Sequence, residues 1–395
     1  MIVYNKTWLN NLLIHHEADD ALASSGITND DVRSIKKQYP VGFYTPGIFI
    51  RIGLFILTFI VVQFSVGFAS FLLMATHLIN NFGWILFVGI GIYIALELMI
   101  KKMNYYRSGV DDALLWLSAG FIIGSYIWML ITIDPGFNKD HFISISAFIF
   151  ILSFYFTLRF ADTMMSAVVC LSLLSIVFFS WKSIGTFGVA TLPFIMMLVS
   201  GMIYLISFRL SANEKAQHYE NCLTIIQSLS LLTLYAACNY YVVDQLSSLL
   251  TPSTSGKPVP FGMFFWIWTM LLPLALIFKG MYNKDTILLR IGLLLVFVSI
   301  ATFRYYYHVL STEGALTLGG IILLVIVYGV IKYLKANPHG FTAADTNKAD
   351  IMDRLKVESL ITGETLGHTH TGHASQGDKF GGGDFGGGGS GGNYE

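Results

Sequence analysis

One cluster of polar and aromatic side chains in this sequence could bind a ligand. Its arginine could hold an anion, and its tyrosine rings could line a pocket around that anion. A second tyrosine pair just before Asp244 could complete the same pocket if the apolar segments between them span a membrane. The alternative, which we prefer, is an interfacial aromatic belt with one arginine that reaches the lipid headgroups. The candidate residues are Arg304, Tyr306, His308, Glu313, Tyr240 and Tyr241.

Three ionisable residues lie in or next to long apolar segments, where charge is costly and often functional. Arg51 is close enough to the start of its segment to snorkel to the interface. Glu97 precedes Lys101 by four residues and can pair with it on one helix face. Asp162 belongs to a tight turn, together with Arg159. For all three we prefer these structural roles to a role in transport or in a proton relay.

The sequence contains only weak patterns for a metal site and none for a catalytic site. His368, His370 and His373 have a spacing that permits metal binding, but they lie in a flexible tract that would hold a metal weakly. No Ser/His/Asp, Cys/His or HExxH arrangement occurs at useful spacing, and the glycine-rich tail lacks the Gly-Lys-Ser/Thr of a phosphate loop. The sequence predicts no cofactor and favours a protein that is not an enzyme.

The composition indicates a membrane protein. Hydrophobic residues make up 54% of the 395 residues and charged residues only 12%, whereas soluble domains carry about 25% charged residues. The mean hydropathy is +0.64. The formal net charge is zero, so overall charge gives no reason to expect a nucleic-acid partner.

The chain is predicted to be all-α, a polytopic transmembrane bundle of about ten helices, because a spanning helix needs about 20 apolar residues. The basic residues between the segments alternate in number, so the positive-inside rule places both termini in the cytoplasm. The segment 223–243 is the most polar of the set. The predicted spans are 48–68, 84–100, 110–131, 142–158, 164–179, 189–208, 223–243, 261–278, 287–303 and 315–333.

The remaining residues form three shorter segments around the transmembrane domain at 46–335. Residues 1–45 are predicted to be a cytoplasmic helical segment, with helices from Lys6 to Ser24 and from Thr28 to Gln38. Thr28 and Asp31 fit a capping box at the start of the second helix. Residues 336–366 form a cytoplasmic amphipathic segment, and the His- and Gly-rich tail at 367–395 is expected to be disordered.

The N-terminal hundred residues resemble a bacterial family of uncharacterised multi-spanning membrane proteins, a domain of unknown function with short cytoplasmic helices before its spans. The resemblance rests on Trp8, on Gly26-Ile27-Thr28-Asn29-Asp30 and on Arg51-Ile52-Gly53. It implies an architecture and a place in the bacterial inner membrane, and it implies no chemistry. The glycine-rich run 380–392 is similar to the tails of TPM-domain envelope proteins, although the TPM domain itself is absent.

The sequence therefore favours an integral inner-membrane protein that acts as a non-enzymatic scaffold or sensor. Its expected partners are membrane lipids and a protein bound at the cytoplasmic termini. A transporter of a small or lipid-like substrate is the first alternative. An intramembrane enzyme that acts on lipid-linked substrates, with Arg304, His308 and Glu313 in one pocket, is the second.

Overall fold

The computed structural model describes residues 2–23, 26–74, 79, 81–134, 136, 139–250, 260–283 and 285–307, and scattered residues between 314 and 332. All of them belong to one compact unit, Met1–Thr346. Within these residues the regular elements are helices, and an isolated bridge pairs Tyr44 with Tyr105. The predicted all-α class is confirmed. The candidate residues His308, Glu313, His368, His370 and His373 lie outside the described residues.

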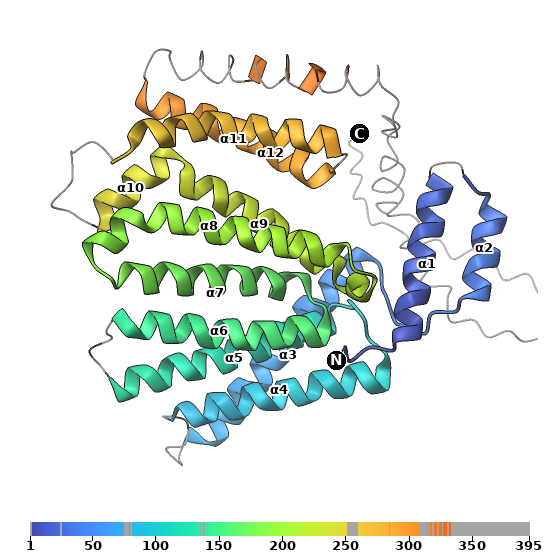
Figure 1. Cartoon of the computed structure of the whole chain (residues 1–395). Helices are drawn as coiled ribbons and strands as arrows, with labels where there is room; N and C mark the ends of the chain where they lie inside the picture. Colours follow the sequence, from blue (N-terminus) through green and yellow to red (C-terminus); the bar gives the residue numbers. More distant parts are fainter. Residues whose placement is uncertain are drawn as a thin grey trace, which may run out of the picture. The chain divides into compact units, whose positions relative to one another are not determined.

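Two short helices precede the apolar ones and form a hairpin, α1 (Lys6–Ala23) and α2 (Asn29–Gln38) (Figure 1). The predicted capping box is confirmed at the start of α2. The Asp31 amide donates to the Thr28 hydroxyl at 3.3 Å, and the Thr28 amide donates to the Asp31 carboxylate at 3.0 Å. An ion pair of 2.8 Å between Lys36 and Asp19 joins the two helices.

Nine described helices are long and apolar enough to cross a membrane, so the chain is a multi-pass membrane protein. They overlap nine of the ten predicted spans. The tenth, 315–333, is described only at scattered residues. The helices are α3 (Ile48–Leu72), α4 (Phe82–Met103), α5 (Val110–Ile133), α6 (Lys139–Phe160), α7 (Thr163–Lys182), α8 (Thr186–Ser211), α9 (Glu220–Cys238, preceded by the 3-10 turn η3 at Glu214–Tyr219), α11 (Gly262–Asn283) and α12 (Thr286–Tyr306).

Consecutive helices pack as antiparallel pairs, α4 with α5, α6 with α7, α8 with α9, and α11 with α12 (Figure 1). Contacts of α5 with α6, of α7 with α9 and of α9 with α12 join these pairs. We call the end of the bundle beside α1 and α2 the hairpin end, and the other the opposite end. Odd-numbered helices from α3 to α9 begin at the hairpin end.

One predicted span is interrupted. The prediction of a single helix over 223–243 was wrong, because α9 ends at Cys238 and a separate helix, α10 (Tyr240–Leu250), follows. Asn239 between them has extended backbone dihedrals. Its side-chain oxygen accepts from the amides of Tyr241 and Val242 at 3.0 and 3.3 Å. Asn239 therefore caps α10, which explains why the first helix stops there.

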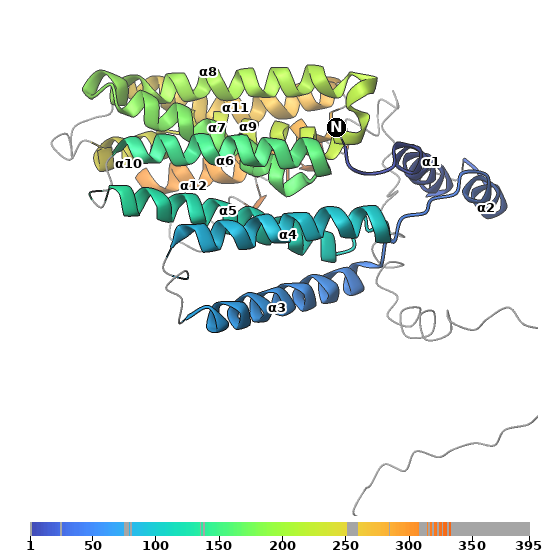
Figure 2. The ribbon, with the colours of Figure 1, turned by 90° about the horizontal axis from the view of Figure 1, so that it is seen from below.

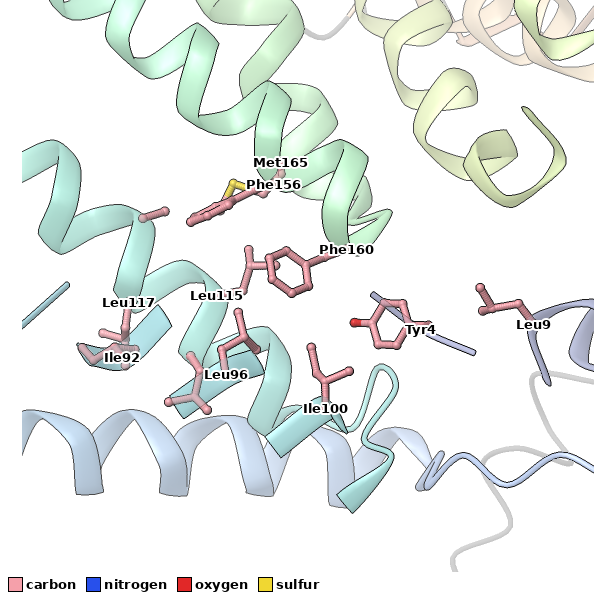
Figure 3. Packing of buried hydrophobic residues seen from close by; sticks show 12 residues of the cluster. Tyr4, Leu9, Ile92, Leu96, Ile100, Leu115, Leu117, Phe156, Phe160 and Met165 are labelled. Atoms are coloured by element: carbon pink, nitrogen blue, oxygen red, sulfur yellow. The ribbon is translucent and has the colours of Figure 1, made fainter. Parts of the chain in front are cut away.

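The largest buried cluster lies where α4, α5 and α6 meet near the hairpin end (Figure 3). The backbones of α4 and α5 approach closely at Gly89, where an added Cβ would lie 2.8 Å from an Ile122 side-chain atom. Small residues at such positions are typical of membrane helix pairs. The labelled members are Tyr4, Leu9, Ile92, Leu96, Ile100, Leu115, Leu117, Phe156, Phe160 and Met165.

The helix α3 lies at the edge of the bundle and packs mainly on α5 (Figure 2). No residue of its most apolar stretch is buried, and Phe64 is 76% exposed. Polar contacts hold α3 near both ends, an Arg51–Asp112 ion pair of 2.7 Å and a hydrogen bond of 3.0 Å from Trp84 to Ser70. Such an apolar surface is suited to contact with lipid.

We expect Gly109→Ala to destabilise the protein more than Gly185→Ala. Both glycines have a left-handed backbone, with φ of +93° and +95°. A Cβ at Gly109 would lie 2.1 Å from the Arg51 carbonyl oxygen, whereas a Cβ at Gly185 would meet nothing within 4 Å. Gly185→Ala should cost about 1–3 kcal/mol from backbone strain alone. Gly109→Ala should cost more because α3 must move away from α5.

The measurement is the free energy of unfolding of both variants in the same detergent. Both sites have a positive φ, and only Gly109 lies against the backbone of α3, so an excess loss for Gly109→Ala reports the approach of α3 to the start of α5. Equal losses would contradict the assigned packing of α3.

Candidate functional site

The N-terminal residues attach the α1–α2 hairpin to the bundle. The Val3 amide donates to the Arg159 carbonyl oxygen at 3.0 Å. Tyr4 is only 8% exposed. Its ring packs in a T-shaped arrangement with the rings of Tyr106 and Phe43, at centroid distances of 4.9 and 6.1 Å. Figure 3 shows Tyr4 beside Ile100 and Phe160, at the point where the chain enters the bundle. The hairpin is therefore anchored by a buried aromatic side chain.

Tyr4 packs against Tyr106 in the loop between α4 and α5. Asn104 and Arg107 both have positive φ, 54° and 49°, which is uncommon for residues other than glycine. The Asp111 carboxylate holds the loop by accepting from the amides of Arg107 and Ser108, each at 2.8 Å, and from the Ser108 hydroxyl at 2.8 Å. The Tyr44 amide donates to the Asn104 carbonyl oxygen at 3.1 Å. Strain of this kind persists only where surrounding contacts fix it.

Charged groups surround the anchor. Burial raises the pKa of the Tyr4 hydroxyl well above its ordinary value, and the negative charges of Asp111, Asp112 and Asp162 raise it further. Burial also raises the pKa of Asp162, although a hydrogen bond from the Met165 amide and the positive charge of Arg107 lower it. Three carboxylates are thus held near Tyr4, and a movement of the hairpin would change the environment of all three.

Next to this anchor, Glu97 is the centre of a second charged group. Its carboxylate accepts from Arg159 Nε and Nη2 at 3.0 and 2.9 Å and from the Tyr93 hydroxyl at 2.6 Å. Lys101 Nζ donates to its other oxygen at 2.7 Å, which confirms the predicted i,i+4 pair. The Tyr93 and Tyr155 hydroxyls are 2.6 Å apart and share a hydrogen bond. The side chain of Arg159 thus contacts Glu97, 62 residues away.

The three intramembrane candidates therefore differ in role. Arg51 pairs with Asp112 through Nη2 at 2.7 Å, with its side chain 40% exposed. Glu97 joins α4 to α6. Asp162 caps α7 by accepting from the Met165 amide at 2.7 Å. All three lie toward the hairpin end, and each has a structural partner.

At the opposite end the structure brings Tyr240, Tyr241 and Tyr306 together. Tyr240 stacks on Trp266 with ring centroids 4.9 Å apart and meets Tyr306 edge-on at 5.0 Å. The Tyr306 hydroxyl donates to Asp244 Oδ2 at 2.6 Å. Burial raises the pKa of Tyr240, and the charge of Asp244 adds to this. Arg304 lies in the last turn of α12, in the same region.

The arrangement at this end has the composition of an aromatic belt, and it adds a carboxylate that the predicted anion pocket did not include. The pocket and the lipid-enzyme hypothesis also require His308 and Glu313, so both stay predictions. The three histidines of the tail stay a predicted metal site for the same reason. Within the described residues, no group of three or more His, Cys, Asp or Glu side chains could hold a metal ion.

A polar network surrounds the break at Asn239, which is 1% exposed. Its side-chain nitrogen donates to the hydroxyls of Tyr235 and Thr302, each at 3.0 Å. The Tyr240 amide donates to the Thr269 hydroxyl at 3.0 Å, and the Ser299 hydroxyl donates to the Thr269 carbonyl oxygen at 2.9 Å. The network joins α9, α10, α11 and α12.

Comparison with known proteins gave no match: no family model, no curated protein and no solved structure matches the chain. The resemblance to the bacterial multi-spanning family and to the TPM-type tails therefore stays a prediction.

Several residues of these sites were not predicted from the sequence. Tyr4 gave no signal, because one tyrosine in a polar segment has no distinctive spacing. Asp112 was not predicted as the ion-pair partner of Arg51, because the two residues lie 61 positions apart. Asn239 was visible as one of the few amides in an apolar segment, and that signal could have indicated the break.

We expect Asp162→Asn to stabilise the protein at neutral pH, and the gain to vanish in acid. The folded-state pKa of Asp162 is raised, so the ionised carboxyl lowers stability above that pKa. The penalty disappears as pH falls through the folded-state pKa toward about 4, the ordinary aspartate range. Asparagine keeps an oxygen that can cap α7. The measurement is the free energy of unfolding against pH.

Asp162→Ala serves as the control, because it also removes the ionised carboxyl but keeps no capping oxygen; its free energy of unfolding should follow that of Asp162→Asn with pH and lie about 1 kcal/mol below it throughout. A gain for Asp162→Asn that grows as the pH is lowered would contradict the assigned sign.

Proposed function

We propose that this protein is a non-enzymatic sensor or scaffold of the bacterial inner membrane that acts through its hairpin end, with that end in the cytoplasm. The observation that carries the proposal is the anchoring of the α1–α2 hairpin by Tyr4 among three carboxylates. A hairpin held at its base, by Tyr4 and by the hydrogen bonds of Val3 and Tyr44, can be displaced as a unit, and its displacement would alter the loop and the turn that surround Tyr4.

The orientation is supported by the distribution of basic residues over the two ends. More of them lie at the hairpin end, as expected for the cytoplasmic side. Between α3 and α12, the described basic residues of the hairpin end are Arg51, Lys101, Lys102, Arg107, Arg159, Arg209, Lys215, Lys279 and Arg290, and those of the opposite end are Lys139, Lys182 and Arg304.

The hairpin also has the surface of a docking element. Its second helix is polar and exposed, with the side chains of Arg33 and Asp30 84% and 91% exposed. Ring contacts to the bundle lie at the base of the hairpin, where Tyr4 and Phe43 both pack on Tyr106. A bound protein could therefore cover α2 without displacing the anchor, or could pull the anchor out. The first event is scaffolding and the second is sensing.

The test places a photo-crosslinking amino acid at position 33, in place of Arg33, in cells that express the full chain. We expect adducts with a discrete protein, and we expect Tyr4→Ala to change their yield because the hairpin loses its fixed position. The measurement is the adduct pattern by mass spectrometry. The control crosslinker replaces Tyr282, which is 81% exposed at the same end of the bundle but is not part of the hairpin.

Adducts at position 33 that are identical to those at position 282, or that do not respond to Tyr4→Ala, would contradict the proposal. Crosslinks to lipid alone would contradict it as well.

A transporter is the second candidate, and the break at Asn239 favours it. Discontinuous helices with polar side chains around the break form the substrate sites of many transporters. Backbone that is not helical is tolerated at membrane depth only where protein or a water-filled cavity surrounds it. Here Tyr235, Thr269 and Thr302 supply the surrounding polar groups.

Thiol labelling separates the two candidates. Alternating access requires that a cysteine in the network react with a membrane-impermeant reagent from either side of the membrane. We expect Ser299→Cys to stay unlabelled from the hairpin end if the protein is a sensor or scaffold, because Ser299 is 4% exposed. Ser153→Cys is the matched control, since Ser153 is 2% exposed and bonds only within its own helix, to the Ile149 and Phe150 carbonyl oxygens.

The native Cys170, Cys222 and Cys238 are buried and would be replaced first. Labelling of Ser299→Cys from both sides, with Ser153→Cys unlabelled, would overturn the sensor proposal in favour of transport.

A further inference from the structure

The outer face of α4 and α6 changes from apolar to charged toward the hairpin end. On α4, the residues Ile90, Ile94 and Leu98 are 45%, 51% and 50% exposed, and Lys101 follows on the same face. On α6, Ile151 is 67% and Tyr155 is 38% exposed, and Arg159 follows at the next turn. Both faces thus present alkyl groups first and polar groups last, which is the order of acyl chain and headgroup in a phospholipid.

The charged part of this face carries an excess of positive charge. Glu97 is one negative charge, and Lys101 and Arg159 are two positive charges within 2.7 and 2.9 Å of it. Lys101 is the more accessible of the two cations, with its side chain 56% exposed. One of its three N–H donors meets Glu97. The group as a whole can therefore attract one anion.

The position of these groups matches the headgroup region. Glu97 lies six residues before Met103, the last residue of α4, which is about 9 Å along a helix axis. Lys101 lies two residues before that end. Lysine near a helix end can extend its ammonium to the phosphate level while its stem stays among the alkyl chains.

Two tyrosine hydroxyls line the boundary between the apolar and charged parts. The Tyr93 ring stacks on Phe156 at a centroid distance of 5.8 Å and an interplanar angle of 1°, and its hydroxyl bonds Glu97. The Tyr155 hydroxyl meets that of Tyr93 at 2.6 Å and belongs to an exposed side chain. Glu97 holds the side chains of Arg159, Lys101 and Tyr93 in place before a ligand binds. This lowers the entropic cost of ordering these hydrogen-bond donors around a ligand.

We propose that this face binds one anionic phospholipid in the leaflet at the hairpin end. Lys101 and Arg159 would meet its phosphate, Tyr155 its glycerol region, and Ile94, Leu98 and Ile151 its acyl chains. The proposal requires only that the chain spans a membrane, and it does not depend on the role of the α1–α2 hairpin.

The experiment purifies the full chain, reconstitutes it in nanodiscs of phosphatidylcholine mixed with phosphatidylglycerol, and measures retained lipid by native mass spectrometry. We expect one phosphatidylglycerol to be retained in preference to phosphatidylcholine. Lys101→Gln should reduce its occupancy about fivefold, the ratio expected for the loss of one basic residue at a membrane surface. Tyr155→Phe should reduce it less, because it removes only a hydroxyl.

The control is Lys102→Gln. Lys102 is the neighbouring exposed lysine on α4 and contributes the same general surface charge, so its replacement should leave the retained lipid nearly unchanged. Far-UV circular dichroism of each variant establishes that it is folded.

Three results would overturn the proposal. One is an equal loss for Lys102→Gln and Lys101→Gln, which would show only a general attraction to the surface. Another is equal retention of phosphatidylcholine. The third is displacement of the lipid by inorganic phosphate alone, which would assign the site to free phosphate.

Discussion

The absence of water from the hydrocarbon layer is the constraint on which this structure depends, because every polar group within it needs a partner in the protein. Among the described residues, each buried side-chain nitrogen or oxygen atom has a hydrogen-bond partner. Several serine and threonine hydroxyls bond a carbonyl oxygen of their own helix, as Ser200 does to Met196 at 2.6 Å. The Asn239 side chain has both an oxygen and a nitrogen, and a single carbonyl oxygen of its own helix cannot satisfy both. Its hydrogen bonds end α9 and cap α10, and the network around it joins α9, α10, α11 and α12.

The same constraint gives the two ends different chemistry. At the hairpin end the polar groups are full charges, and carboxylates such as Glu97 and Asp112 are compensated by arginines. At the opposite end they are mostly hydroxyl and amide groups, around Asn239 and Thr302. Charge pairs are compatible with the headgroup region, where water and lipid phosphates reach them. Neutral groups that bond one another can be buried more deeply.

Hydropathy predicted the helices well because a spanning helix must satisfy its own backbone, and this requires only local sequence. For the same reason the capping box at Thr28 and the Glu97–Lys101 pair were predictable, since each involves residues three or four positions apart. The break at Asn239 had a local signal, an amide that can cap the next helix, but the burial of that amide depends also on Thr302, 63 residues away. Nor could the sequence pair Arg51 with Asp112 or anchor Tyr4, because these contacts exist only once α3, α5 and the hairpin have packed.

One residue joins the two proposals at the hairpin end. The carbonyl oxygen of Arg159 accepts from the Val3 amide, one residue from the Tyr4 anchor, and its guanidinium binds Glu97 on the lipid-facing side. A lipid phosphate bound by the guanidinium would therefore contact the same residue that holds Val3. Linkage is reciprocal, so a lipid that favours the docked hairpin would be bound more tightly when the hairpin is docked. A sensor of this design would read the anionic lipid of its own leaflet, and a partner protein that releases the hairpin would weaken the lipid by the same factor.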